Sequence, residues 1–145
     1  MTVKIKKVKG NANIPFYATD GSAGMDLSAC IDEPLSLMPG ERKAVPTGIA
    51  IALPSSDYVG LVYVRSSLGL KKGIMLPNAV GVIDSDYRGE ILVALTNISD
   101  EEYIFAQGER IAQLVITPVV HAQLEVADEL PETPRGVGGF GSTGV

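Results

Sequence analysis

Short runs of apolar, mostly β-branched residues follow one another along the chain, and prolines or glycines separate them. The runs cover residues 3–5, 47–53, 58–64, 80–83, 91–96, 111–117 and 119–126. Nine prolines and 16 glycines divide the chain into pieces too short for ordinary helices. β-Branched residues in short runs bounded by turn formers are typical of strands. The pattern therefore predicts an all-β domain of the sandwich, jelly-roll or barrel type.

One short helix is expected within residues 66–72, directly after the apolar run 58–64. Ser66 or Ser67 could cap its first turn, and Gly73 could end it.

Residues 81–89, GVIDSDYRG, lie between two apolar runs and end in glycine. This arrangement predicts a β-hairpin with the carboxylates of Asp84 and Asp86 near its tip. Asp, Ser and Gly are also ordinary turn residues, so a turn without chemistry is the alternative.

The last 15 residues, PETPRGVGGFGSTGV, differ in composition from residues 1–130. Segments rich in Gly and Pro bury too little apolar surface to order themselves, so a domain over 1–130 and a mobile arm over 131–145 are expected. The arm could be only a frayed terminus. However, Arg135, Phe140, Ser142 and Thr143 are a cation, an aromatic ring and two hydroxyls, which would suit a lid over a phosphorylated ligand.

Length and composition narrow the class of protein. The 145 residues suit one domain, and 46% apolar residues with a mean hydropathy of +0.21 suggest that part of the apolar surface lies in a subunit interface. A net charge of −5 argues against nucleic-acid binding. Cys30 and His121 are each the only residue of their kind, which excludes an internal disulfide and a Cys- or His-rich metal site. We expect a cytoplasmic protein, because neither a signal peptide nor a membrane-spanning run is found.

Several polar residues interrupt apolar stretches. Asp26 in AGMDLSA needs a partner if it is buried, either an arginine or backbone amides, or else it lies near a metal. Arg65, Ser66 and Ser67 in RSSLGL could bind phosphate oxygens, or could simply be a helix cap beside a solvated arginine. Gln113 in GERIAQLVI would normally point outward or satisfy a buried backbone group.

Taken together, AGMDLSA, RSSLGL, GVIDSDYRG, GERIAQLVI and RGVGGFGSTG resemble, in this order, the five motifs of the homotrimeric dUTPases, the deoxyuridine 5'-triphosphate nucleotidohydrolases. VPTGIA at residues 45–50 fits the same family. The resemblance implies a jelly-roll-like (β-clip) subunit, a threefold trimer with active sites shared between subunits, and hydrolysis of dUTP to dUMP and pyrophosphate with Mg²⁺. This reaction keeps uracil out of DNA and supplies dUMP for thymidylate synthesis.

By motif position, Asp84 resembles the general base that activates the water attacking the α-phosphorus. Tyr87 would lie under the deoxyribose and exclude a 2'-hydroxyl. The uracil ring would be read by the hairpin backbone and by one asparagine side chain. The residues implied for this are Asn78, Gly81, Val82, Ile83 and Leu92.

The resemblance also implies the residues that bind the phosphates. Arg65, Ser66, Ser67 and Gln113 are the expected ligands in the body of the domain. Mg²⁺ would be held mainly by the substrate phosphates, with Asp26 in the outer shell through water. The arm would contribute Arg135 to the γ-phosphate and Phe140 to a stack over uracil. Gly141, Ser142 and Thr143 would contact the phosphate chain.

Two other functions fit parts of the pattern. A dCTP deaminase of the same superfamily would share the fold, but the RGVGGFGSTG arm fits the hydrolase better. A module that binds dUTP and recruits a protein partner without catalysis would have no need of Asp84, Tyr87 and the arm together.

Overall fold

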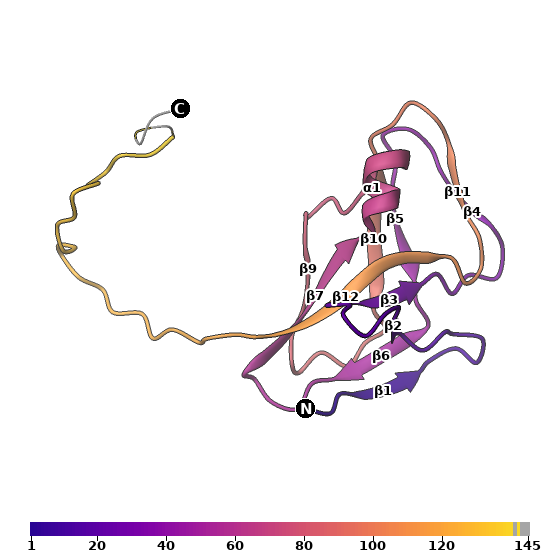
Figure 1. The fold of residues 1–145 in the computed structure, drawn as a ribbon, viewed down its shortest axis with the longest axis horizontal. Coiled ribbons are helices and arrows are strands. Elements are labelled where there is room, and N and C mark those ends of the chain that lie inside the picture. Colours follow the sequence, from indigo (N-terminus) through magenta and orange to yellow (C-terminus); the bar gives the residue numbers. More distant parts are fainter. Residues whose placement is uncertain (141, 143–145) are drawn as a thin grey trace.

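The computed structural model describes residues 1–140 and 142, and its largest sheet has five antiparallel strands (Figure 1). In spatial order these are β2 (Phe16–Tyr17), β3 (Met25–Ser28), β12 (Arg110–Pro118), β7 (Tyr58–Val64) and β9 (Gly81–Ile83). β12 is the longest strand and pairs with β3 on one side and β7 on the other. β9 lies at the edge of this sheet and pairs only with β7.

Three smaller antiparallel sheets accompany the large one in the described part of the chain. β10 (Leu92–Asn97) lies between β5 (Arg42–Pro46) and β8 (Ile74–Met75). β1 (Lys4–Lys7) pairs with β6 (Ile49–Ala52), and β4 (Leu35–Leu37) pairs with β11 (Tyr103–Phe105).

All four sheets contribute to one hydrophobic core. Its fully buried side chains include Leu27 and Leu114 from the large sheet, Leu95 from β10, Ile49 from β6 and Phe105 from β11. Apolar faces of several small sheets that meet in one core are the architecture expected of a jelly-roll-like domain. The predicted all-β fold is confirmed.

The helix α1 (Ser66–Lys72) is the one helix in the described residues, and its limits are those predicted. Gly73 ends it at φ +63°, where its N–H donates to the carbonyl oxygens of the last turn. The predicted serine cap is wrong. Arg65 occupies the cap position, and no side chain caps the first turn. No helix in this part of the chain is long and apolar enough to cross a membrane.

The predicted hairpin pairing and one predicted strand are wrong, although both strands of the hairpin are present as β9 and β10. Residues 80–83 and 91–96 do not form a hairpin ladder, because β9 joins the large sheet while β10 joins β5 and β8. Residues 119–126 form no strand, since the chain leaves the body after Pro118 and the side chains of Val120, Leu124 and Val126 are exposed.

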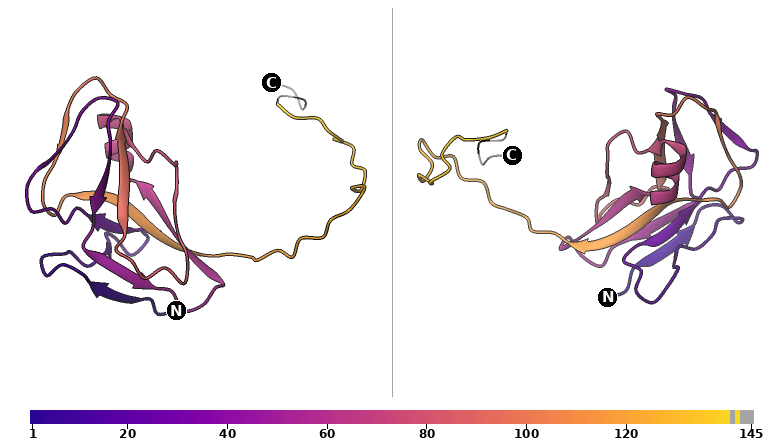
Figure 2. Two further views of the ribbon diagram at one scale, coloured as in Figure 1. Left: turned by 180° about the vertical axis from the view of Figure 1, so that it is seen from behind. Right: turned by 45° about the horizontal axis from the view of Figure 1, so that its top comes forward.

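The chain beyond Pro118 runs away from the sheets in all three views (Figures 1 and 2). Two contacts hold its start: Val119 N donates to Asp57 O at 2.9 Å, and His121 Nε2 lies 3.0 Å from Ser56 O. This departure comes before the predicted boundary at 130/131, which itself stays a prediction.

Asn97 fastens the loop after β10 to the body of the domain. Its side chain is fully buried, and Nδ2 donates to Leu37 O at 2.9 Å and Glu101 O at 2.7 Å. Oδ1 accepts from the backbone N–H and the hydroxyl of Ser99. One amide therefore satisfies both sides of the turn over residues 98–101.

Replacement of Asn97 by Ala should cost about 2–4 kcal/mol of unfolding free energy, because two carbonyls lose their donor in a buried place. Chemical denaturation followed by circular dichroism measures this loss. Asn13→Ala is the control, since Asn13 is exposed, and should change stability by less than about 0.5 kcal/mol. Equal stability of the two variants would contradict the assignment.

Candidate functional site

Asp26 on β3 is the centre of a buried ionic cluster. Its side chain is 2% exposed, and Arg110 Nη1 donates to its Oδ2 at 2.9 Å. Arg65 Nε lies 3.3 Å from Oδ1, to which Gln113 Nε2 also donates at 3.3 Å. Two guanidinium groups and one amide compensate for the burial of the carboxylate. The expected arginine partner of Asp26 is therefore present, and there are two.

Strand pairing explains how these residues meet. Gln113 on β12 lies directly opposite Asp26 on β3, and residues in direct register share a face of the sheet. Arg110 is three residues from Gln113, so a regular strand would place it on the other face. The register shifts between Arg110 and Ala112, and such a bulge turns Arg110 back to the face of Asp26. Arg65 follows Val64, which pairs with Ala112 on the far side of β12.

The cluster borders a hollow of about 300 Å³ at the start of α1. Its charged lining is mainly basic. The lining residues are Arg65, Ser67, Leu68, Lys71, Lys72, Tyr103, Glu109 and Arg110. Ser66 and Ser67 are exposed, and in the described residues neither hydroxyl is used as a helix cap. Four cations and two accessible hydroxyls make this end of the sheet a suitable place for an anion.

Glu109, the one acid in that lining, is already engaged. Its Oε1 accepts from the Tyr103 hydroxyl at 2.6 Å, and its Oε2 accepts from Ala106 N at 3.0 Å. Burial, and then the nearby Glu109 carboxylate, raise the pKa of Tyr103 to about 12. Tyr103 therefore stays protonated at neutral pH and can keep donating to Glu109.

Asp84 and Tyr87 lie in a different part of the chain, in the loop between β9 and β10. Both side chains are exposed, and Tyr87 N donates to Asp84 O at 3.2 Å. Asp84 and Val82 line a second hollow of about 720 Å³, together with Tyr58 from β7. Val119 and His121 line it as well, so the segment that leads into the arm starts beside Asp84.

The two groups lie far apart within one chain. Ile83, next to Asp84, pairs with Gly60, which is five residues before Arg65 in the same strand run. At about 3.3 Å per residue, this separates the two positions by roughly 17 Å. Moreover, the Arg65 side chain reaches past β12 to Asp26 on β3. Asp84 follows β9, which lies on the opposite side of β7. The structure thus joins Asp26, Arg65 and Gln113, but does not bring Asp84 to them.

The remaining predicted residues of the body lie on β9, in the loop before it and at the start of β10. Asn78 is exposed in the loop before it, Val82 is 61% exposed, and Leu92 at the start of β10 is 53% exposed. Gly81 and Ile83 are half-buried in the ladder with β7. Gly81, Val82 and Ile83 share the edge strand β9, whereas Leu92 belongs to the sheet of β5, β10 and β8, and the binding role of all these residues stays a prediction.

The arm residues lie away from both hollows. Arg135 Nε donates to Gly138 O at 2.8 Å, and Phe140 is exposed. Ser142 N donates to Gly139 O at 3.0 Å. Gly141 and Thr143 lie outside the described residues.

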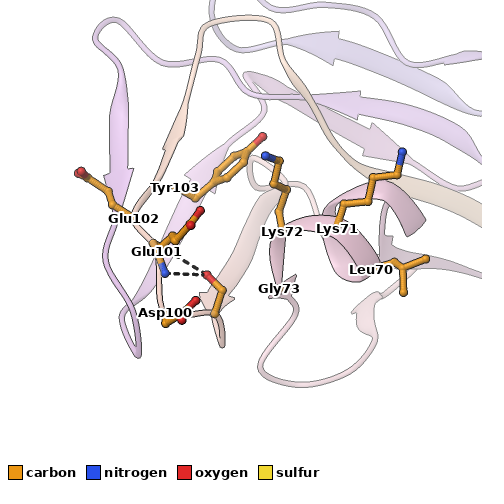
Figure 3. A pocket seen from close by; sticks show the side chains of 9 residues that line it. Leu70, Lys71, Lys72, Gly73, Asp100, Glu101, Glu102 and Tyr103 are labelled. Atoms are coloured by element: carbon orange, nitrogen blue, oxygen red, sulfur yellow. Dashed lines mark hydrogen bonds between the residues drawn. The ribbon is translucent and has the colours of Figure 1, made fainter.

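A third hollow, of about 410 Å³, separates the C-terminal end of α1 from the loop over residues 99–103 (Figure 3). Lys71 and Lys72 line it on one side, and Asp100, Glu101 and Glu102 on the other. Among the described residues no ion pair crosses it. It contains none of the predicted site residues, and we assign no role to it.

Sequence reasoning did not single out Arg110, Lys71 or Lys72. An arginine partner could be expected from the sequence, because Asp26 lies in an apolar stretch and a buried carboxylate needs a cation or backbone amides beside it. The bulge that brings Arg110 to Asp26 has no clear sequence signal, because Ile111 and Ala112 read as ordinary strand residues.

Comparison with known families and proteins identifies relatives over nearly the whole chain. The dUTPase family model matches residues 10–144. The deoxyuridine 5'-triphosphate nucleotidohydrolase of Burkholderia cenocepacia is 51% identical over 144 residues, which cover 99% of this chain and 97% of that protein. The enzyme of the same name from Burkholderia multivorans is 49% identical with the same coverage.

Solved structures show the same fold. A mutant dUTPase of Staphylococcus bacteriophage 80alpha in complex with dUpNHpp has a TM-score of 0.86 and 28% identity, and 99% of each chain is covered. A mutant dUTPase from phage phi11 of S. aureus has a TM-score of 0.80 at 24% identity, with 89% of this chain and 98% of that chain covered.

Replacement of Asp26 by Ala should lower the unfolding free energy by about 2–4 kcal/mol, because two partly buried arginines lose their counter-charge and Gln113 loses its acceptor. Denaturant unfolding measures this loss. Asp32→Ala is the matched control. The Asp32 side chain is 81% exposed, and its oxygen lies 3.7 Å from Lys9 Nζ in a surface ion pair. Such pairs contribute little, so removal of Asp32 should cost less than about 0.5 kcal/mol. A loss as small as that of the control would show that Asp26 does not hold the cluster together.

Proposed function

The chain belongs to the dUTPase family and is a dUTP diphosphatase, and we propose that its active sites form between subunits of a homotrimer, where water attacks the α-phosphorus of dUTP to release dUMP and pyrophosphate. The observation that carries this proposal is the separation, within one chain, of Asp84 from the cluster around Asp26. A general base must lie within hydrogen-bond reach of its water. Asp84 of one chain and Arg65 of another can meet this demand if the two hollows face each other across a subunit interface.

Asp84 is proposed as the general base. Its carboxylate is exposed at the rim of the larger hollow, where a water can reach it. A proton taken from that water would raise the nucleophilicity of the oxygen at the moment of attack. The leaving group is pyrophosphate, whose charge the cations of the opposing subunit would stabilise.

The nucleoside is proposed to bind along β9. As an edge strand, β9 has backbone N–H and C=O groups on its outer side that its own sheet does not pair. Such groups can match the donor and acceptor edge of uracil, and cytosine would leave an unmatched group. Asn78, Val82 and Leu92 would surround the base, and Tyr87 would exclude a 2'-hydroxyl.

The triphosphate is proposed to bind Arg65, Ser66, Ser67 and Gln113. Asp26 engages Arg65 through Nε, so the terminal guanidinium nitrogens face away from that bond and can donate to phosphate oxygens. Gln113 is held by the same carboxylate. Asp26 thereby orients two of the proposed phosphate ligands before the substrate arrives, which is the preorganisation that favours charge stabilisation.

Mg²⁺ fits this site as an ion bound mainly by the substrate. In the described residues, no three His, Cys, Asp or Glu side chains gather into a metal-binding cluster, which suits an ion that keeps waters and phosphate ligands. The phage phi11 dUTPase has a structural Mg(II) ion. Asp26, already bonded to two arginines, would act in the outer shell through water. When bound, Mg²⁺ would neutralise phosphate charge.

The arm is proposed to close over the site. Residues 119–140, which lead into the arm and include most of it, form no helix or strand, and at up to about 3.3 Å per residue such a segment can reach a neighbouring subunit. Arg135 would then bind the γ-phosphate and Phe140 would stack on uracil, with Gly141, Ser142 and Thr143 on the phosphates. In the cytoplasm, the reaction would keep uracil out of DNA and supply dUMP.

Asp84→Asn and Arg65→Ala should each reduce turnover of dUTP by at least about a hundredfold, since each removes one half of every site. Co-assembly of the two variants should restore part of the activity. In mixed trimers some sites receive Asp84 and Arg65 together from different chains. Pyrophosphate release measures turnover, and mixing assembled trimers without subunit exchange is the control. Failure of co-assembled trimers to recover activity would contradict shared sites.

Deletion of residues 135–145 should leave the sedimentation coefficient that of a trimer and lower kcat by about a hundredfold, because the lid and its phosphate contacts are lost. Phe140→Ala should reduce activity less than the deletion. Val137→Ala, in the same exposed segment, should match the unaltered chain. Full turnover by the deletion variant would refute the lid.

A further inference from the structure

The Tyr87 ring lies directly against Gly89. A Cβ atom added at Gly89 would stand 2.5 Å from Tyr87 Cζ and 3.0 Å from Cε2, and closer still to the hydroxyl oxygen. The φ angle of Gly89 lies outside the left-handed region, so its backbone could accept another residue. The position of the Tyr87 ring therefore leaves no room for a Cβ atom at residue 89, whereas the backbone conformation of the turn would permit one.

The Tyr87 hydroxyl is held as well. It donates to the backbone oxygen of Glu90 at 3.0 Å. The Tyr87 side chain is 44% exposed, so burial alone does not fix it. Contact with Gly89 and the bond to Glu90 are thus what determine the position of the ring.

The carbonyl that receives the hydroxyl is itself anchored. Gly48 N donates to Glu90 Oε1 at 2.7 Å. The next residue, Ile91, donates through its N–H to Ile49 O at 2.9 Å and accepts at its oxygen from Thr47 Oγ1 at 2.7 Å. Thr47 N also donates to Ile91 O at 3.3 Å, so four bonds tie residues 90–91 to the turn over residues 47–49. This turn lies within VPTGIA at residues 45–50.

The turn over residues 47–49 has little freedom to move. Thr47 is 1% exposed, and Gly48 has φ +70°. A Cβ atom at Gly48 would stand 2.6 Å from both Ala12 Cβ and Cys30 Sγ, which are buried in the core. The anchor of Glu90 is thus set into the packed interior of the domain.

We propose that Gly89 and Glu90 are positioning residues that hold the Tyr87 ring rigidly enough to exclude a 2'-hydroxyl, and so determine the preference for dUTP over UTP. This inference rests on the proposed role of Tyr87. A steric filter discriminates only if yielding to the extra group is costly. A free tyrosine ring could rotate about its two side-chain bonds and make room for a 2'-hydroxyl. The Tyr87 ring is restrained, because its hydroxyl is bonded to the anchored Glu90 carbonyl and the ring lies against the backbone of Gly89.

Gly89→Ala tests the proposal because its clash falls on the outer end of a side chain. The added methyl group would force the ring away from position 89 and from its bond to Glu90, and because the ring is 44% exposed the melting temperature should change little. The ratio of kcat/KM for dUTP to kcat/KM for UTP should fall by about tenfold or more. Gly10→Ala is the matched control, since a Cβ there meets nothing within 4 Å, and should leave both the ratio and the melting temperature unchanged.

A pair of variants at Glu90 tests the anchor. Glu90→Ala removes the acceptor of Gly48 N and should lower the same ratio. Glu90→Gln keeps an oxygen acceptor in the same place and should retain most of the discrimination. Loss of the ratio in both variants to the same degree would show that the bond to Gly48 is not the cause.

Tyr87→Ala separates this proposal from the one on which it rests. If Tyr87→Ala lowers the ratio while Gly89→Ala and Glu90→Ala leave it unchanged, Tyr87 is the filter and the positioning role is refuted. If Tyr87→Ala leaves the ratio unchanged, Tyr87 is not the filter and both proposals fail. The proposal requires all three variants to lose discrimination.

Discussion

The buried carboxylate of Asp26 is the constraint on which the proposed phosphate side of the site depends. A charge at 2% exposure is tolerable only with compensating partners, and here Arg65, Arg110 and Gln113 supply them. These partners come from β12 and from the end of β7, so the ionic cluster joins three adjacent strands. The same contacts that compensate for burial also aim the arginine and the glutamine. Stability of the sheet and orientation of the ligands therefore have one origin.

The strand order determines which of these residues a single chain can bring together. β3 and β9 lie on opposite sides of the β12–β7 pair, so residues fixed to these strands face different neighbours. The cluster around Asp26 belongs to one side and Asp84 to the other. A chain with this topology presents two partial surfaces, each with the chemistry that the other lacks. Association of copies is therefore part of the function that we propose, and the exposed apolar side chain of Val82 lies on the surface that carries Asp84.

Much of this could be predicted from the sequence, and the failures have physical causes. The helix over residues 66–72 and the strand over 58–64 were predicted with the limits observed, since sharp turn signals bound them. Short strands such as β8 and β2 carry too few residues for a period to show. Asp84 was identified, but the hairpin around it was not correct, because pairing of β9 with β7 is a long-range choice that local turn residues cannot reveal. The bond from Gly48 N to the Glu90 carboxylate is likewise a long-range contact that local sequence does not reveal.

The departure of the chain from the body at Val119 has a consequence for the arm as a tethered ligand. The 16 residues from 119 to 134 would, as a flexible linker, have a root-mean-square length of roughly 20–25 Å, comparable to the size of the domain itself. A motif on such a tether experiences a local concentration in the millimolar range. Its own affinity for the bound nucleotide can then be weak and still close the site for most of the time. Weak individual contacts reopen quickly, so the tether that would favour the proposed closure would also permit rapid exchange of product for substrate.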